Sequence, residues 1–99
     1  MTINVQYVKM QNSETMTEIV SKKLNKLSAK YEWIINANVA FKLENDPAGK
    51  GNICEIELSL PGPKIFASSK EKNFELAAKN TVMDLAKQLK KRKATYNQH

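Results

Sequence analysis

The spacing of apolar residues changes between two periods along this chain, and the order of these periods restricts the fold more than any other feature. Four stretches alternate apolar and polar residues, as half-buried strands do, and two repeat their apolar residues every three or four positions, as amphipathic helices do. In chain order, we predict a strand over 2–8, a helix over 14–31, strands over 35–44, 53–60 and 64–68, and a helix over 74–93. The predicted order is therefore βαβββα.

The connections between these elements indicate how the strands pair. A helical crossover joins the first two strands and permits parallel pairing, whereas the loop over 45–52 and the turn Pro61-Gly62-Pro63 suit antiparallel pairing. Each strand has one apolar face, so both helices are expected on the same side of the sheet. We predict an α+β fold, a two-layer sandwich in which two helices pack on one face of a four-stranded mixed sheet.

Capping residues and composition indicate where the elements end and how large the unit is. Ser13, which follows Asn12, and Asn73 each precede a predicted helix and can accept a hydrogen bond from its first turn. From Ala94 onward the chain is polar, and we expect the tail over 94–99 to fray. A length of 99 residues, with ordinary apolar and charged fractions, suits one domain over 1–99 with a single core.

Few residues suggest catalysis or metal binding. Cys54 is the only cysteine, falls on the apolar face of its predicted strand and is expected to act as a small core residue in a reducing compartment. Glu55 and Glu57 share the opposite face, and we expect solvated carboxylates at a sheet edge, because no nucleophile or glycine-rich phosphate loop accompanies them. The single histidine, His99, is the last residue. We therefore expect no enzyme activity, no small-molecule substrate, no cofactor and no metal.

The sequence also lacks the signals of secretion or membrane insertion. Met1 to Met10 has no continuous apolar core of the kind that a signal peptide needs, and the apolar runs elsewhere are far shorter than a membrane span. We expect a cytoplasmic protein with no membrane partner.

Positive charge is concentrated in the two predicted helices. Residues 19–31 contain no acid and sum to +4, residues 76–93 sum to +5, and the rest of the chain sums to −3, within a net charge of +6. Clustered cations maintain a local field that interspersed acids would cancel, so this segregation favours a polyanionic partner over two merely solvated faces. The candidate binding residues are Lys22, Lys23, Lys26, Lys30, Lys79, Lys87, Lys90, Lys91, Arg92 and Lys93.

The predicted fold places these two basic runs side by side. Lys22, Lys26 and Lys30 are four residues apart and follow one stripe of the first helix, and most basic residues of the second helix lie close to one stripe as well. With both helices on the same face of the sheet, the stripes form two adjacent ridges. Tyr31 and Trp33 could stack on bases, but closing the junction between the first helix and the second strand is the preferred interpretation.

Ordered motifs across the chain resemble a known family. They are Lys23-Leu24-Asn25-Lys26-Leu27, Pro61-Gly62 before the fourth strand, and the stretch from Phe74-Glu75 through Ala77 to Lys93, which contains Leu85-Ala86-Lys87-Gln88-Leu89-Lys90-Lys91-Arg92-Lys93. Together with the length and the order of elements, they are similar to short bacterial members of the ribosome hibernation promoting factor family. That family is also called ribosome-associated inhibitor A or the sigma-54 modulation protein family. The resemblance covers roughly residues 2–93.

This resemblance implies a fold similar to a double-stranded RNA-binding domain and a function without chemistry. Members of the family bind the small ribosomal subunit in the cleft for messenger and transfer RNA, and silence translation in starved or stationary cells. The partner implied here is ribosomal RNA of that subunit, bound by a protein that is monomeric off the ribosome. Carried over by position, the residues facing RNA would be Lys23, Lys26, Lys87, Lys90, Lys91 and Lys93. Lys22, Lys30, Lys79 and Arg92 extend that surface on charge and spacing alone.

Two other functions are compatible with parts of the sequence. A general double-stranded or structured RNA-binding protein would use the same basic surface, since phosphate contacts position a protein without reading sequence. A small enzyme such as an acylphosphatase is the weaker alternative. That family needs a glycine-rich phosphate loop with an arginine, whereas Arg92, the only arginine here, lies at a lysine-rich helix end.

Overall fold

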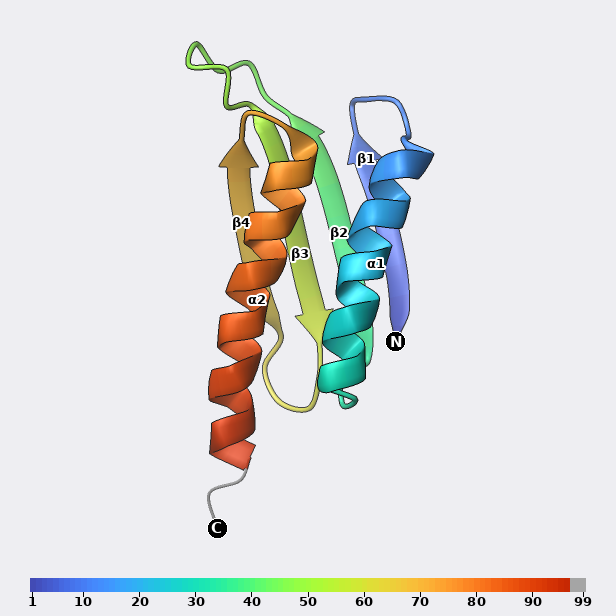
Figure 1. Cartoon of the computed structure of the whole chain (residues 1–99), viewed down its shortest axis with the longest axis vertical. Helices are drawn as coiled ribbons and strands as arrows, with labels where there is room; N and C mark the ends of the chain where they lie inside the picture. The colour runs from blue at the N-terminus through green and yellow to red at the C-terminus, as the bar shows by residue number, and fades with distance from the viewer. Residues whose placement is uncertain (97–99) are drawn as a thin grey trace.

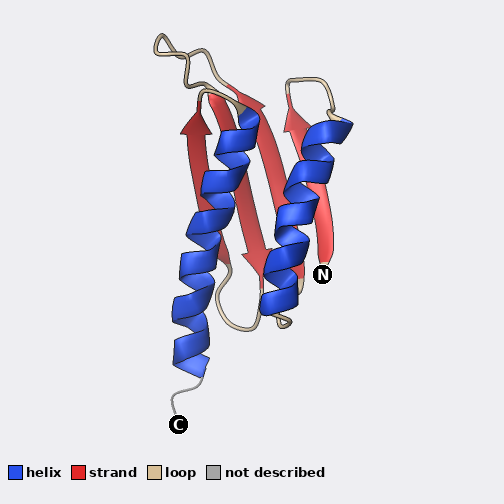
Figure 2. Ribbon diagram, in the orientation of Figure 1, coloured by secondary structure: helices blue, strands red, loops and turns tan. Residues whose placement is uncertain are grey.

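The computed structural model of the chain describes residues 1–96 and shows a four-stranded sheet covered on one face by two helices (Figure 1). The elements are β1 (Thr2–Val8), α1 (Glu14–Lys30), β2 (Asn36–Leu43), β3 (Asn52–Ser59), β4 (Ile65–Glu71) and α2 (Phe74–Tyr96). Their order is βαβββα, and the predicted two-layer α+β architecture is confirmed (Figure 2).

The strands lie in the sheet in the order β1-β2-β3-β4. β1 pairs with β2 in parallel, with Val5 opposite Val39. The pairing can be parallel because α1 carries the chain back to the end of the sheet where β1 begins. The two later pairings, β2 with β3 and β3 with β4, are antiparallel. This topology leaves β1 and β4 as the two edge strands.

Both predicted caps hold the start of a helix. The Ser13 hydroxyl oxygen accepts a hydrogen bond from the Met16 amide at 3.2 Å, and the Asn73 side-chain oxygen accepts one from the Leu76 amide at 2.7 Å. Each cap satisfies a backbone donor that has no partner within its own helix, which is worth about 1 kcal/mol.

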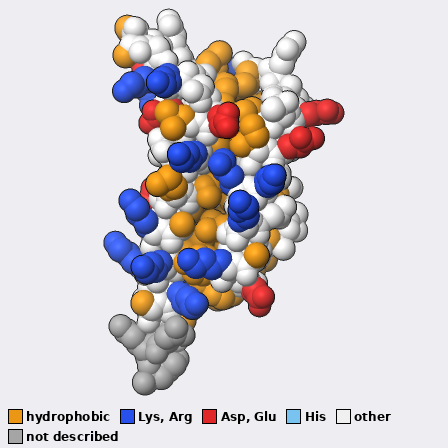
Figure 3. Space-filling model, in the orientation of Figure 1, with side chains coloured by type: hydrophobic (Ala, Val, Ile, Leu, Met, Phe, Trp, Pro, Cys, Tyr) orange, Lys and Arg blue, Asp and Glu red, His pale blue; other side chains and the backbone are white. Residues whose placement is uncertain are grey.

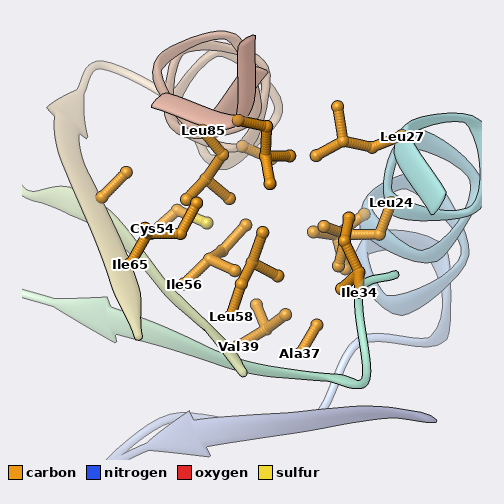
Figure 4. Packing of buried hydrophobic residues seen from close by; sticks show 14 of the residues in the cluster. Leu24, Leu27, Ile34, Ala37, Val39, Cys54, Ile56, Leu58, Ile65 and Leu85 are labelled. Carbon is orange, nitrogen blue, oxygen red and sulfur yellow. The ribbon is translucent and has the colours of Figure 1, made fainter. Parts of the chain in front are cut away.

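One hydrophobic core fills the space between the helices and the sheet. Leu24 of α1 and Leu85 of α2 project towards Ile56 and Leu58 of β3, and all four side chains are fully buried (Figure 4). Burial of each contributes about 1.5–3 kcal/mol. Since the apolar stripe of each helix must face the sheet, the lysines on its other sides must face solvent.

An aromatic corner, consisting of Tyr31, Trp33 and Tyr96, closes the end of the molecule where both helices stop. The Trp33 ring meets Tyr31 edge-on at 5.7 Å and Tyr96 edge-on at 5.0 Å between centroids. The Tyr96 hydroxyl donates to the Pro61 carbonyl, and the Arg92 guanidinium donates to the same oxygen at 3.3 Å. The corner therefore joins the end of α1, the turn between β3 and β4, and the last turns of α2, and it confirms that Tyr31 and Trp33 close the junction after α1.

That turn depends on Gly62. Gly62 has a φ of 94°, and a Cβ built on it would lie 3.2 Å from the Arg92 guanidinium. Only glycine adopts this conformation without strain, and its lack of a side chain lets Arg92 approach the turn.

Two elements, β4 and α2, end three residues later than predicted. β4 continues to Glu71 rather than ending at Ser68, because it pairs with β3 as far as Asn52. α2 continues to Tyr96 rather than ending at Lys93. The reason is tertiary: contacts of Tyr96 with Trp33 and Pro61 hold the last helical turn. The remainder of the predicted tail, residues 97–99 with His99, lies outside the described part of the chain.

The buried face of β2 also differs at its start. Ile35, the first residue of the strand predicted over 35–44, is 60% exposed, whereas its neighbour Ile34 is buried. The strand begins only at Asn36, after a turn at residues 32–33, so the alternation does not extend back to Ile35. Leu43, the last residue of β2, is likewise exposed.

The other face of the sheet is open and polar. The Asn4 amide donates to Asn36 and Asn38, which extends a row of amides across β1 and β2. Glu55 and Glu57 lie on β3, an interior strand, so the expected position at a sheet edge is wrong.

Cys54 is fully buried, as predicted, and its titration should be visible in the stability of the fold. Burial is the largest cause that raises the pKa of the thiol from 9.0 to about 11. The folded pKa lies above the unfolded one, so the neutral, buried thiol stabilises the fold. This contribution is fully present below about pH 9 and is lost as the pH rises through about 11. We expect wild type to lose up to about 2–3 kcal/mol more than Cys54→Ala over that range.

Urea unfolding of both proteins measures this difference, since all other side chains are common to them. A stability difference that stays constant from about pH 8 to about pH 11 would contradict the assignment.

The aromatic corner gives a second prediction. Tyr96→Ala removes an edge-on ring contact and a hydrogen bond, so it should lower the free energy of unfolding by about 1–2 kcal/mol and speed amide exchange over residues 90–96. Tyr96→Phe keeps the ring and should lower the free energy of unfolding by about half as much. Equal protection of those amides in wild type and Tyr96→Ala would show that the corner does not hold the helix end.

Candidate nucleic-acid interface

The outer surface of the helix layer is basic because the core uses the opposite side of each helix. In α1, Val20, Leu24 and Leu27 are buried, and Lys22, Lys26 and Lys30 are exposed. Lys23 is half-buried, at the margin of the two faces.

α2 shows the same division. Ala78, Leu85 and Leu89 are buried against the sheet. The exposed lysines of this helix are Lys79, Lys87, Lys90, Lys91 and Lys93. Lys79, Met83, Lys87 and Lys91 follow each other at four-residue intervals, so they form one stripe along the helix.

A groove of about 310 Å³, referred to below as the lysine groove, separates the two helices. Lys23, Lys26, Leu27 and Lys30 line it from α1, and Lys79, Val82 and Met83 line it from α2. Figure 3 shows the same arrangement: lysine and arginine side chains lie over both helices, with a strip of hydrophobic side chains between them. The structure thus brings four of the predicted binding residues to one groove.

The lysines of the helices differ from those of the sheet in their partners. Lys42 pairs with Glu55 at 2.8 Å, Lys64 pairs with Glu57 at 3.5 Å, and Lys70 pairs with Glu44. These are the ion pairs within residues 1–96, and none involves a lysine of α1 or α2. The sheet side therefore neutralises its own charge, whereas the helix layer leaves its charge available to a ligand.

The ion pair between Lys70 and Glu44 affects the pKa of the lysine. Hydrogen bonding to Glu44, followed by the charge of that carboxylate, raises the pKa of the Lys70 ammonium. Both side chains are half exposed, so solvent screens the pair and its contribution to stability is small.

Arg92 differs from the other predicted binding residues. Its side chain is half-buried and its guanidinium donates to Pro61, so it helps to hold α2 against the turn. This role cannot be predicted from local sequence, because the turn lies 31 residues away in the chain.

Met83 was not identified from the sequence. It is 51% exposed and contributes to the apolar part of the lysine groove. The only sequence signal was its position midway between Lys79 and Lys87, four residues from each. Val82, the residue before Met83, is half-buried and lines the same groove.

Within the described residues, no three histidine, cysteine, aspartate or glutamate side chains gather as metal ligands would. Neither of the two helices is long and apolar enough, within residues 1–96, to cross a membrane. Glu55 and Glu57 are engaged in ion pairs on the open sheet face.

The fold and this surface define a small α+β protein whose two adjacent helices present a shared basic face. Comparison of sequences identifies its family. The chain belongs to the family described as sigma 54 modulation protein / S30EA ribosomal protein, whose family model matches residues 3–97. No curated protein sequence matches the chain.

Two solved structures have a similar fold. A ribosomal subunit interface protein from Coxiella burnetii is 24% identical, with a TM-score of 0.84 over 95% of this chain and 99% of that one. The N-terminal domain of Thermus thermophilus Protein Y is 25% identical, with a TM-score of 0.78 over 92% of this chain and 98% of that one.

The crowding of like charges around the lysine groove should cost stability. Lys79→Glu places a carboxylate opposite the α1 lysines, so it should raise the free energy of unfolding by about 0.2–1 kcal/mol at low salt. The gain should shrink at high salt, because exposed charges are screened. Thermal unfolding at two ionic strengths measures it, and Lys50→Glu in the β2–β3 loop is the matched control. An equal effect of both substitutions would contradict the proximity of these lysines.

Proposed function

We propose that this protein binds the small ribosomal subunit in the cleft for messenger and transfer RNA and so silences translation in starved or stationary cells. It would act there as a cytoplasmic, monomeric, single ribosome-binding domain over residues 1–99, with no catalytic step. The observation that carries this proposal is the set of helix lysines that lack an acidic partner within residues 1–96. Family membership supports the ribosome as the partner, and so does the similarity to a ribosomal subunit interface protein from Coxiella burnetii.

The lysine groove suits a phosphate backbone. Lysines on both walls can neutralise phosphates, and the release of counterions supplies binding free energy that falls steeply with salt. Lysine is a flexible point charge, so these contacts position the protein without reading bases. Specificity for one cleft would then come from the shape of RNA and protein together.

A domain held in that cleft would inhibit by occupying space. Messenger RNA, transfer RNA and the protein would compete for the same phosphates and the same volume, so binding would be mutually exclusive. The assigned residues for this contact are those of the two helices: Lys22, Lys23, Lys26, Lys30, Lys79, Lys87, Lys90, Lys91 and Lys93, with Arg92 acting chiefly through the turn.

The test uses charge reversal on α2. The triple variant Lys87→Glu, Lys90→Glu, Lys91→Glu should bind ribosomes about 100-fold more weakly, since three phosphate contacts become repulsive. These side chains are exposed, so the fold should be retained. Co-sedimentation with small subunits in sucrose gradients, with and without transfer and messenger RNA, measures binding and competition.

The matched control reverses three exposed lysines outside the helix layer, Lys9, Lys50 and Lys72. Both triple variants lower the net charge from +6 to 0, because each replacement changes the charge by two. Equal losses in the two variants would show that total charge, not the helix surface, determines binding. Comparable affinity of wild type for an arbitrary RNA hairpin would favour a general RNA-binding protein instead.

A further inference from the structure

The outer edge of β1 is an unprotected sheet edge. β1 lies at the border of the sheet, beside α1 (Figure 1). The Thr2 amide donates to the Ile35 carbonyl, which places the backbone groups of Thr2 towards the sheet interior. Backbone direction alternates along a strand, so Ile3, Val5 and Tyr7 direct their N–H and C=O groups outward. No group within residues 1–96 bonds to them.

The opposite edge is protected in the ways that proteins normally use. The Gln88 side chain of α2 donates to the Phe66 carbonyl of β4 at 2.9 Å, and β4 carries the charged residues Lys70 and Glu71. β1 contains no charge, no proline and no glycine, and is rich in residues that favour strands. An edge of this kind is a template for another strand.

A groove of about 550 Å³ runs alongside this edge. Its floor consists of Ile3, Val5 and Tyr7, and its wall is the first half of α1, which includes Glu14 and Glu18. Neither carboxylate has an ion-pair partner within the described residues. Acidic side chains are visible over the start of α1 in Figure 3, apart from the lysines.

We propose that β1 and this groove bind an extended, basic peptide segment of a partner protein as an added strand. The backbone of the segment would pair with the outward groups of Ile3, Val5 and Tyr7. Side chains at alternate positions would enter the groove, apolar ones against its floor and arginine or lysine against Glu14 and Glu18. This site is independent of the lysine groove, because it lies on the flank of α1 that faces away from α2.

Charge complementarity decides the occupant. A second copy of β1 would match the floor of the groove, but the strand Thr2–Val8 has no cation to place against the acidic wall. A nucleic acid would meet Glu14 and Glu18 with like charge. A basic segment can pack apolar side chains on the floor of the groove, place its cations against the acidic wall and pair with the backbone of β1.

The probe is a capped synthetic peptide of about eight residues, long enough to span the seven residues of β1. Its sequence is Thr-Val-Thr-Val-Thr-Arg-Thr-Arg, and the reversed sequence tests the opposite strand direction. We expect one of the two to bind with a dissociation constant on the order of 10–100 µM by calorimetry. Amide shifts in NMR spectra should be confined to β1 and the first half of α1.

Two changes separate strand addition from charge attraction alone. Alternate peptide nitrogens can be methylated in two ways, at the odd or at the even residues. One of these two sets should weaken binding at least about tenfold and the other should have little effect, since only one set of amides faces β1. Val5→Pro removes an outward amide without breaking the pairing with β2, so it should weaken peptide binding by at least about tenfold. Glu18→Lys should also weaken it about tenfold, with Glu75→Lys at the start of α2 as its control.

Ribosome sedimentation of Val5→Pro should match wild type, which separates this proposal from the proposed function. The proposal is overturned if neither peptide binds at millimolar concentration, or if both methylated registers bind like the parent. It is also overturned if the NMR shifts fall on the lysine groove, or if sedimentation equilibrium shows that the protein dimerises through β1. Should Val5→Pro not fold, the methylated peptides decide the outcome with wild-type protein.

Discussion

The packing of both helices against one face of the sheet is the constraint on which the rest of this structure depends. Leu24, Leu27, Leu85 and Leu89 must reach the apolar side of the strands, so the orientation of each helix about its axis is determined by the core. Once that orientation is set, the lysines have one remaining direction, towards solvent on the side away from the sheet. The position of the basic surface is thus a consequence of hydrophobic burial rather than of any contact among the lysines themselves.

The two faces of the protein handle charge in opposite ways. On the sheet side, Lys42, Lys64 and Lys70 each have an acidic partner. Across the helix layer, lysines face one another over the lysine groove, an arrangement that opposes folding through repulsion. A stable monomer gains nothing from that repulsion, whereas a protein that binds phosphates gains affinity from every cation left without a partner. This difference is the physical basis of the proposed ribosome interaction.

Most of the fold could be predicted, because period and connection length are local properties. The six elements, both caps, the turn at Gly62 and the buried Cys54 all follow from residues close in sequence. The errors occur where distant residues decide the outcome. Tyr96 extends α2 because Trp33 and Pro61 hold it, and Arg92 turns towards Pro61 instead of joining the exposed lysines. The assignment of individual RNA contacts stays a prediction.

The sequence by itself determined which residues are basic, which faces are apolar and which order the strands and helices take. These features follow from the sequence because the polarity of each side chain, and the period at which apolar residues recur, are defined within one or two helical turns. Only the tertiary structure decided that Lys23, Lys26 and Lys30 share a groove with Lys79, and that Met83 lines the same groove. It also decided that β4 is protected by Gln88 while β1 is open beside Glu14 and Glu18. These relations depend on how far apart two packed elements lie, a distance that the core sets and the local pattern does not contain.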